Sequence, residues 1–265
     1  MAEDPASSKI DTTRPSVARM YDYYLDGKDN FSVDRDAVAQ VEAVMPDVRQ
    51  VARENRAFLK RAVRLMAAAG LRQFIDLGAG LPTAGNTHEI AQQVAPGSRV
   101  VYVDNDPIVL AHGRALLASD DTTAVVAGDL RRPAEVVGHP ETRQLIDFEQ
   151  PVGVLLIAMT HFLLDTEREQ VMGALRAAIA PGSYVAVTHV TGDRHPREVT
   201  EGVERAYSAT PTPIYFRTHP DVLRFFDGLA LAEPGLVFVD AWRPELAEPT
   251  IAATGWLYGG VAHKP

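Results

Sequence analysis

The chain has 265 residues, of which 46% are hydrophobic, and its 26 Lys and Arg residues against 35 Asp and Glu residues give a formal net charge of −9. This length suits one large α/β domain or one domain with a small accessory layer, and the acidic balance disfavours nucleic-acid binding through bulk electrostatics. The absence of cysteine excludes disulfides, thiolate metal sites and cysteine nucleophiles.

Residues 1–70 are predicted to form a helical N-terminal extension that acts as a lid. The first residues, Met1 to Arg14, are polar and of mixed charge, unlike a secretory signal. Apolar residues then recur at helical spacing, with Pro15 suited to a first turn and Gly27 and Gly70 to helix ends. We expect three helices, from Pro15 to Gly27, from Asp34 to Val44 and from Asp47 to Gly70.

From residue 71 to 265 short β-rich runs alternate with helical segments, the pattern of a mostly parallel sheet. The expected strands are Gln73–Leu77, Arg99–Asp104, Ala124–Ala127, Val152–Ala158, Tyr184–His189, Leu236–Ala241 and Ile251–Ala262. The expected helices are Thr87–Val94, Pro107–Ala118, Thr166–Ala180, Pro196–Tyr207 and Pro220–Leu229. The longest apolar run, Val152 to Met159, is far shorter than the ~20 residues of a membrane helix. We therefore expect a soluble, cytoplasmic protein.

A turn with two glycines follows the first of these strands. Asp76 stands near the strand end, and Gly78 and Gly80 follow it one residue apart. Such a turn lets the backbone approach a ligand where a Cβ atom would clash. A dinucleotide fingerprint would place a third glycine at position 83, where the chain has Thr83. Taken alone, the motif is equally compatible with a plain tight turn.

Acidic residues also end the next two strands. Asp104 ends the second strand about 28 residues after Asp76, where a carboxylate can accept hydrogen bonds from both hydroxyls of a ribose, and Asn105 follows it. Asp106 before Pro107 is expected to cap a helix. Asp129 after the third strand suits an adenine amino group, with Leu130 packed on the ring. An isolated Gly-Asp is more often a turn, but three acids at one edge of a sheet favour a ligand site.

These residues resemble the class I S-adenosylmethionine methyltransferases, and Ala180-Pro181-Gly182-Ser183-Tyr184 resembles their turn into the fifth strand. The chain is similar, over nearly its whole length, to the actinobacterial S-adenosyl methyltransferase family first catalogued as a domain of unknown function. The motifs that carry this likeness are Tyr21 to Phe31, Glu54 to Leu59, Gly80 to Thr83 with Asn86-Thr87-His88, and Tyr102 to Pro107. Ser183 replaces a frequent glycine of the class.

The resemblance implies an α/β fold with a doubly wound, seven-stranded, Rossmann-like sheet in the order 3-2-1-4-5-7-6, its last strand antiparallel. It also implies S-adenosyl-L-methionine as cofactor. That molecule needs an acid for its ammonium group, for which Asp76 is suited, and a donor for its carboxylate, for which Arg56 and Asn55 are candidates. The alternative for Arg56 is a solvated surface position.

Candidates for the acceptor side follow the fourth and fifth strands. Met159 is expected to contact the cofactor, and His161 is the candidate general base. For both His161 and His189, however, a histidine satisfied by local hydrogen bonds is the stronger interpretation. Tyr21 and Tyr24 fit core packing better than a role beside the sulfonium.

The eight histidines lack zinc-type spacing, so no metal site is expected. We expect methyl transfer to oxygen or nitrogen of a small molecule, with neither nucleic acid nor membrane as partner. The sequence leaves the oligomeric state open. It also leaves two alternatives, an NAD-dependent oxidoreductase and a non-catalytic regulator that binds S-adenosylmethionine.

Overall fold

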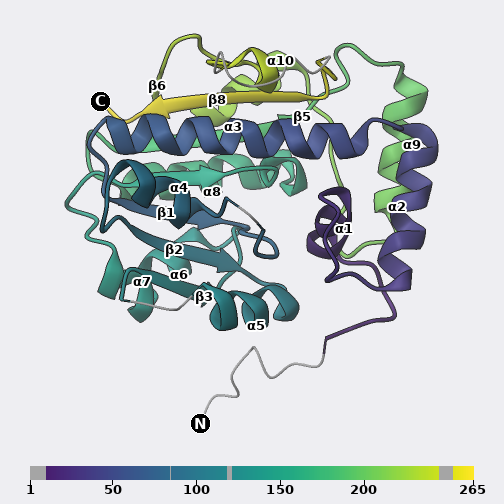
Figure 1. Ribbon diagram of the computed structural model, residues 1–265. Coiled ribbons are helices and arrows are strands. Elements are labelled where there is room, and N and C mark those ends of the chain that lie inside the picture. Colours follow the sequence, from purple (N-terminus) through teal and green to yellow (C-terminus); the bar gives the residue numbers. More distant parts are fainter. Residues whose placement is uncertain (1–9, 84, 118–120, 245–252) are drawn as a thin grey trace.

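An eight-stranded sheet runs through the computed structural model, which describes residues 10–83, 85–117, 121–244 and 253–265. Its order is β3-β2-β1-β4-β5-β8-β6, with β7 also paired to β8 (Figure 1). The strands are β1 (Gln73–Leu77), β2 (Arg99–Asp104), β3 (Thr123–Ala127), β4 (Gly153–Leu156), β5 (Tyr184–Val190), β6 (Ala230–Leu231), β7 (Val237–Phe238) and β8 (Leu257–His263).

The first five strands are parallel and β8 is antiparallel to β5. The expected fold class is thereby confirmed, and so is the order 3-2-1-4-5-7-6 once the additional short strand is counted. On one side of the β1–β4 pair the strands follow as β2 and β3, and on the other side as β5 and β8. The strand order therefore reverses between β1 and β4, which makes this pair the topological switch point. Open α/β sheets bind their ligands there, at the carboxyl ends of the strands.

Two expected strands near the C-terminal end are wrong in their extent. Only Val237–Phe238 of the expected strand Leu236–Ala241 pairs, because Val239–Ala241 closes into a 3₁₀ turn in which Trp242 N–H donates to the Val239 carbonyl. Of the expected strand Ile251–Ala262, residues 251–252 lie outside the described residues. Pairing starts only at Leu257, and Glu54 holds Thr254 by two hydrogen bonds instead.

The described helices of four or more residues are α1 (Val17–Tyr24), α2 (Ser32–Val44), α3 (Val48–Ala68), α4 (Thr87–Val94), α5 (Pro107–Leu116), α6 (Pro133–Gly138), α7 (Pro140–Leu145), α8 (Asp165–Ala178), α9 (Arg197–Tyr207) and α10 (His219–Leu223). The short helices α6 and α7, each with proline in its first turn, were not expected. Position 118, the expected end of α5, lies outside the described residues. No helix in the described parts of the chain is long and apolar enough to cross a membrane.

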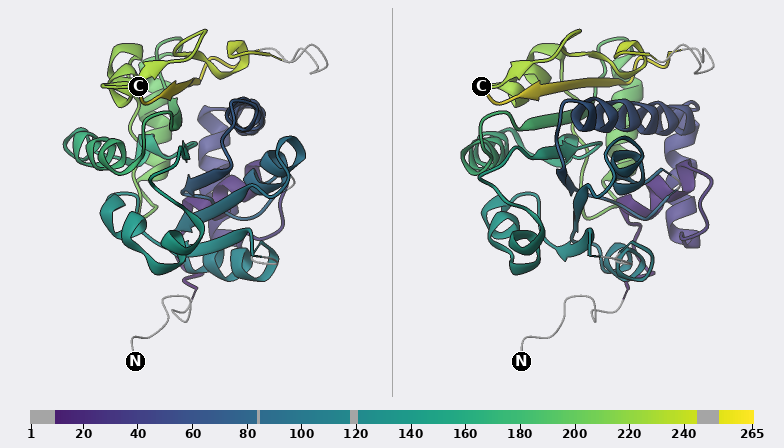
Figure 2. Two further views of the ribbon diagram at one scale, coloured as in Figure 1. Left: turned by 90° about the vertical axis from the view of Figure 1, so that its left-hand side faces the viewer. Right: turned by 60° about the vertical axis from the view of Figure 1, so that its left-hand side comes forward.

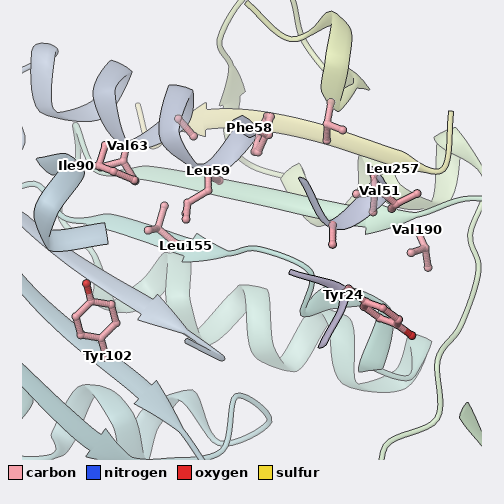
Figure 3. Close-up of a cluster of buried hydrophobic side chains, with 14 of the residues drawn as sticks. Tyr24, Val51, Phe58, Leu59, Val63, Ile90, Tyr102, Leu155, Val190 and Leu257 are labelled. Atoms are coloured by element: carbon pink, nitrogen blue, oxygen red, sulfur yellow. The ribbon is translucent and has the colours of Figure 1, made fainter. Parts of the chain in front are cut away.

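Alternating side chains of the strands bury the two faces of the sheet in two cores. Phe74 of β1 and Leu155 of β4 belong to the core under α3 and α4, whereas Ile75 and Leu156 belong to the core under α8. Figure 2 shows helices on both sides of the sheet, and Figure 3 shows α3 side chains such as Leu59 above Leu155. This doubly covered sheet is a rigid platform for the loops at its edge.

The first two helices lie beyond the carboxyl ends of the strands, and α2 packs against α9 (Figure 1). A buried ion pair joins α1 to α2, with Arg19 Nε 2.7 Å from Asp34 Oδ2. The other Asp34 oxygen accepts from Ser16 N–H at 2.9 Å. Because a buried charge pair loses its solvation, these added hydrogen bonds are what make the Asp34 site favourable, and they fix α1 in place.

Candidate functional site

A cavity of about 530 Å³ opens at the carboxyl edge of the sheet, and residues of α1 form part of its lining. Its volume falls within the range of small-molecule sites. All of the site residues expected from the sequence line it: Asn55, Arg56, Asp76, Gly78, Gly80, Asp104, Asn105, Asp129, Leu130, Met159 and His161. Residues that are up to about 100 positions apart in the chain thus meet in one space.

The two glycines of the turn after β1 have backbone conformations that favour glycine. Gly78 has φ +77° and Gly80 has φ +67°. A Cβ atom on Gly78 would lie 2.1 Å from Met159 Sδ, whereas one on Gly80 would meet nothing within 4 Å. The turn is anchored to β2, because Gly78 N–H donates to the Val103 carbonyl at 2.8 Å. Met159 therefore covers one glycine, and the backbone at the other borders open space.

Asp104 organises the loops around it. Its Oδ2 accepts from Gly80 N–H at 3.0 Å, and its Oδ1 accepts from the N–H groups of Asn105 and Asp106 at 2.8 and 2.9 Å. Burial raises the pKa of this carboxyl to about 6, against the lowering effect of the three N–H donors. Asp106 caps α5, accepting from Ile108 N–H at 3.0 Å, and its other oxygen accepts from Ser16 Oγ.

Asp76 is buried at the end of β1, and its carboxylate has one hydrogen-bond partner among the described residues. Thr87 Oγ1 donates to its Oδ2 at 2.7 Å, and burial raises the pKa of the carboxyl. The guanidinium of Arg56 acts in the opposite direction and donates to the Gly85 carbonyl at 2.6 Å. Arg56 is therefore held by the loop before α4, close enough to Asp76 to lower the pKa of its carboxyl.

Asn55 has protein partners at both ends of its amide. Its Nδ2 donates to Tyr21 Oη at 2.8 Å, and its Oδ1 accepts from Thr188 Oγ1 at 2.8 Å. The same Thr188 hydroxyl accepts from Ala158 N–H at 2.7 Å, at a residue with φ +57°. Both ends of the Asn55 amide are therefore bonded within the protein, and the side chain links α1 to the ends of β4 and β5.

Asp129, after β3, is paired with a neighbour. Arg131 Nε and Nη2 donate to its two oxygens at 2.9 and 2.7 Å, and Arg131 N–H adds a third bond at 2.9 Å. Burial raises the pKa of Asp129, but the bonds and charge of Arg131 outweigh that effect and leave it below the usual value. Leu130 is buried beside it. Arg131 was not among the residues expected from the sequence, where it is only a basic residue two positions after Asp129.

The two histidines after β4 and β5 differ in their surroundings. His189 is fully buried and bonded on both sides, with Nδ1 2.8 Å from Thr160 Oγ1 and Nε2 3.3 Å from Arg217 Nη1. Arginine can only donate, so His189 is neutral and donates from Nδ1. This bonding fits the structural interpretation of His189.

His161 is 4% exposed, and its Nδ1 has no hydrogen-bond partner among the described residues. Burial, followed by the charge of Arg217, lowers its pKa to about 3, so the ring is neutral near pH 7. His161 thus keeps unused hydrogen-bonding capacity at the cavity, unlike His189. In the part of the chain that the structure describes, no cluster of three or more His, Asp or Glu could hold a metal ion.

The outer wall of the cavity is formed by α2, α9 and residues 211–216, to which the sequence assigned no role in the site. Tyr207 of α9, Ile214 and Phe216 belong to it, and Phe162 and Tyr24 line the cavity beside Tyr207. Tyr24 Oη lies 3.3 Å from Tyr207 Oη, 183 positions along the chain. The sequence shows α9 as an amphipathic helix but not which cavity its apolar face borders.

The family model for S-adenosyl methyltransferase matches residues 3–265. The chain is 41% identical to a candidate methyltransferase from Thermobifida fusca, with 96% of this chain and 97% of that chain covered and a TM-score of 0.90. It is 42% identical to a DUF574 family protein from Streptomyces avermitilis, with 97% and 100% covered and a TM-score of 0.91. Human N-acetylserotonin methyltransferase, crystallised with S-adenosylmethionine, shares the fold at 14% identity, with 91% and 62% covered and a TM-score of 0.51. No curated protein sequence matches the chain.

Proposed function

The chain belongs to the S-adenosyl methyltransferase family, and we propose that this S-adenosylmethionine-dependent enzyme methylates an oxygen or nitrogen atom of a small molecule at the cavity lined in part by α1. The observation that carries the proposal is the meeting of Asp76, Asp104 and Asp129 at one cavity. These carboxylates come from three successive strand ends, and each matches a different polar part of the cofactor.

The central contact is between Asp104 and the ribose. Its two oxygens already accept three backbone N–H groups, and a carboxylate has about four lone-pair sites, so about one site remains, on Oδ2, for a ribose hydroxyl. The Gly80 turn beside it leaves open space where a side chain would stand. The carboxylate thus fixes the position of the sugar relative to the glycine turn.

Asp76 and Arg56 suit the amino-acid end of the cofactor. A buried carboxylate with a single hydroxyl donor has free acceptor sites for an ammonium group. Arg56 keeps further N–H donors for a carboxylate after its bond to Gly85. Asn55 supports this end by holding Tyr21 and Thr188, and its contact with the cofactor remains a prediction.

Asp129 and Leu130 suit the adenine, as their place after β3 predicts. Arg131 binds both Asp129 oxygens, and this keeps the carboxylate ionised and oriented. Oδ1 already accepts two N–H groups of Arg131, so the acceptor site left for the exocyclic amino group is on Oδ2. Asn105 and Met159 complete the cofactor side of the cavity.

We propose that an imidazole nitrogen of His161 accepts the proton that the methylated molecule loses. Bound S-adenosylmethionine supplies a methyl group on a positively charged sulfur. A hydroxyl proton becomes strongly acidic as its oxygen gains that methyl group, so a neutral imidazole of low pKa is a sufficient base for it. His189, with both nitrogens bonded, takes no such proton.

The N-terminal helices are proposed to complete this site as a lid on the domain of residues 71–265. Residues of α1, including Tyr21 and Tyr24, line the cavity, and the Ser16 hydroxyl bonds to Asp106 next to the ribose site. Covering the sulfur excludes water and orders the site as the ligand binds.

Calorimetry with S-adenosylhomocysteine and with NAD, followed by transfer of labelled methyl groups to a metabolite extract, tests this function. We expect binding of S-adenosylhomocysteine, no binding of NAD, and label in a small-molecule fraction. Binding of NAD alone would favour an oxidoreductase. Binding of S-adenosylhomocysteine without any transfer would favour a regulator. Label in nucleic acid would contradict the small-molecule acceptor.

A further inference from the structure

The outer wall of the cavity, formed by α2, α9 and residues 211–216, offers only uncharged side chains among the described lining residues. These are Val41, Val203, Tyr207, Pro211, Thr212, Ile214 and Phe216. The charged lining residues come instead from α1, α3, the segment before α1 and the strand ends. A charged acceptor against the outer wall would lose its water without meeting a counter-charge, which is strongly unfavourable.

A row of aromatic side chains lines the cavity from the outer wall to His161. The Tyr207 and Phe162 ring centroids are 6.4 Å apart at 35°, and those of Phe162 and His161 are 4.4 Å apart at 65°. Tyr24 joins the row through its hydroxyl on Tyr207. All four side chains line the cavity, so they present ring faces and edges on which a flat molecule packs well.

The tyrosine pair at this wall has an unused hydrogen-bond donor. Two hydroxyls carry two protons, and their mutual bond at 3.3 Å uses one of them. Burial raises the pKa of Tyr207 to about 12 and that of Tyr24 well above its usual value, so both keep their protons near pH 7. Tyr24 is 2% and Tyr207 8% exposed, and no other partner of either hydroxyl occurs among the described residues. A buried donor of this kind needs an acceptor atom.

We infer that the methyl acceptor is an uncharged, ring-containing molecule that packs along Phe162 and Tyr207, with an oxygen or ring nitrogen on the Tyr24–Tyr207 pair and its methylated group near His161. This inference rests on the proposed function and adds the substrate class. The uncharged wall selects against carboxylated or phosphorylated acceptors, and the tyrosine pair selects among neutral rings for those with an acceptor atom at that place.

The test uses the full chain saturated with S-adenosylhomocysteine and two matched probes. One is 2-naphthol, an uncharged planar ring with one hydroxyl, and the other is 6-hydroxy-2-naphthoate, which adds a carboxylate. Calorimetry compares the wild-type chain with Tyr207→Phe and Tyr24→Phe, each of which removes one hydroxyl and keeps the ring. Tyr184→Phe is the matched control, because Tyr184 packs on His263 outside the cavity.

We expect 2-naphthol to bind and the carboxylated probe to bind at least about tenfold more weakly. Each cavity variant should weaken 2-naphthol by about 3- to 10-fold, the effect of one lost hydrogen bond, while Tyr184→Phe leaves it unchanged. Equal or tighter binding of the carboxylate, no binding of either probe, or unchanged affinity in both cavity variants would overturn the inference. Failure of S-adenosylhomocysteine itself to bind would instead overturn the proposed function.

Discussion

Removal of the Asp104 carboxylate should weaken cofactor binding, because a hydrogen bond to the ribose is lost. A hydrogen bond to a charged group contributes about 1.5–3 kcal/mol, so Asp104→Ala should bind S-adenosylhomocysteine roughly 10- to 150-fold more weakly. Calorimetry measures the affinity, and Asp147→Asn is the control. Asp147 accepts from Glu149 N–H at 3.0 Å in a turn near the opposite end of β1, away from the cavity.

The structure adds a second route to lost affinity in this variant. Asp104 also holds the N–H groups of Gly80, Asn105 and Asp106, so its removal disturbs the glycine turn as well. An analogue of S-adenosylhomocysteine without the ribose 2′ and 3′ hydroxyls separates the two effects in a double cycle. We expect Asp104→Ala to weaken this analogue less than it weakens S-adenosylhomocysteine, because only the effect of the disturbed turn then remains. An equal loss for both ligands, or no loss for either in a folded variant, would refute the ribose assignment.

Three further predictions concern the same cavity. Asp129→Asn should weaken the binding of S-adenosylhomocysteine less than Asp129→Ala does, because an oxygen acceptor remains. S-inosylhomocysteine, which lacks the amino group, should not distinguish the variants. Equal affinities for S-adenosylhomocysteine in all three proteins would remove Asp129 from the site. Since the pKa of Asp104 is about 6 in the free protein, its accepting carboxylate form is lost as pH falls, and affinity should drop about tenfold from pH 7 to pH 5 in calorimetry. Protonation of Asp76, whose pKa is also raised, acts in the same direction, and a flat profile in the wild-type chain would contradict both assignments. Hydrogen exchange should show that S-adenosylhomocysteine protects the backbone amides of residues 21–31 and of the helix around Asn55. Protection confined to the strand-end loops would contradict the prediction that the N-terminal helices form a lid.

The sheet and the acids along its carboxyl edge were predictable because the parallel strands carry local signals. The run from Phe74 to Gly80 contains a buried strand, an acid and two glycines within a few residues, and the runs that end at Asp104 and Asp129 again close an apolar strand with an acid. Parallel pairing then places their ends at one edge by topology alone. The position of the part of the cavity that borders these strand ends follows from these two facts.

The outer wall was not predictable because it depends on pairings between distant segments. The contact of Tyr24 with Tyr207 spans 183 positions, and neither residue differs in the sequence from an ordinary core tyrosine. Likewise, the bonds of Asn55 to Tyr21 and Thr188 join residues 34 and 133 positions away, and they arise only in the folded chain. The strand expected from Leu236 to Ala241 failed for a related reason, since an apolar run alone does not show where a 3₁₀ turn interrupts it.

The most direct measurement is a crystal structure of the chain with S-adenosylhomocysteine. We expect a ribose hydroxyl within hydrogen-bond distance of Asp104, the adenine amino group at Asp129 and the ammonium group at Asp76, with the sulfur facing the space beside His161. A ligand bound away from the carboxyl ends of β1 to β3, or one that leaves Asp104 without a ribose contact, would contradict this prediction.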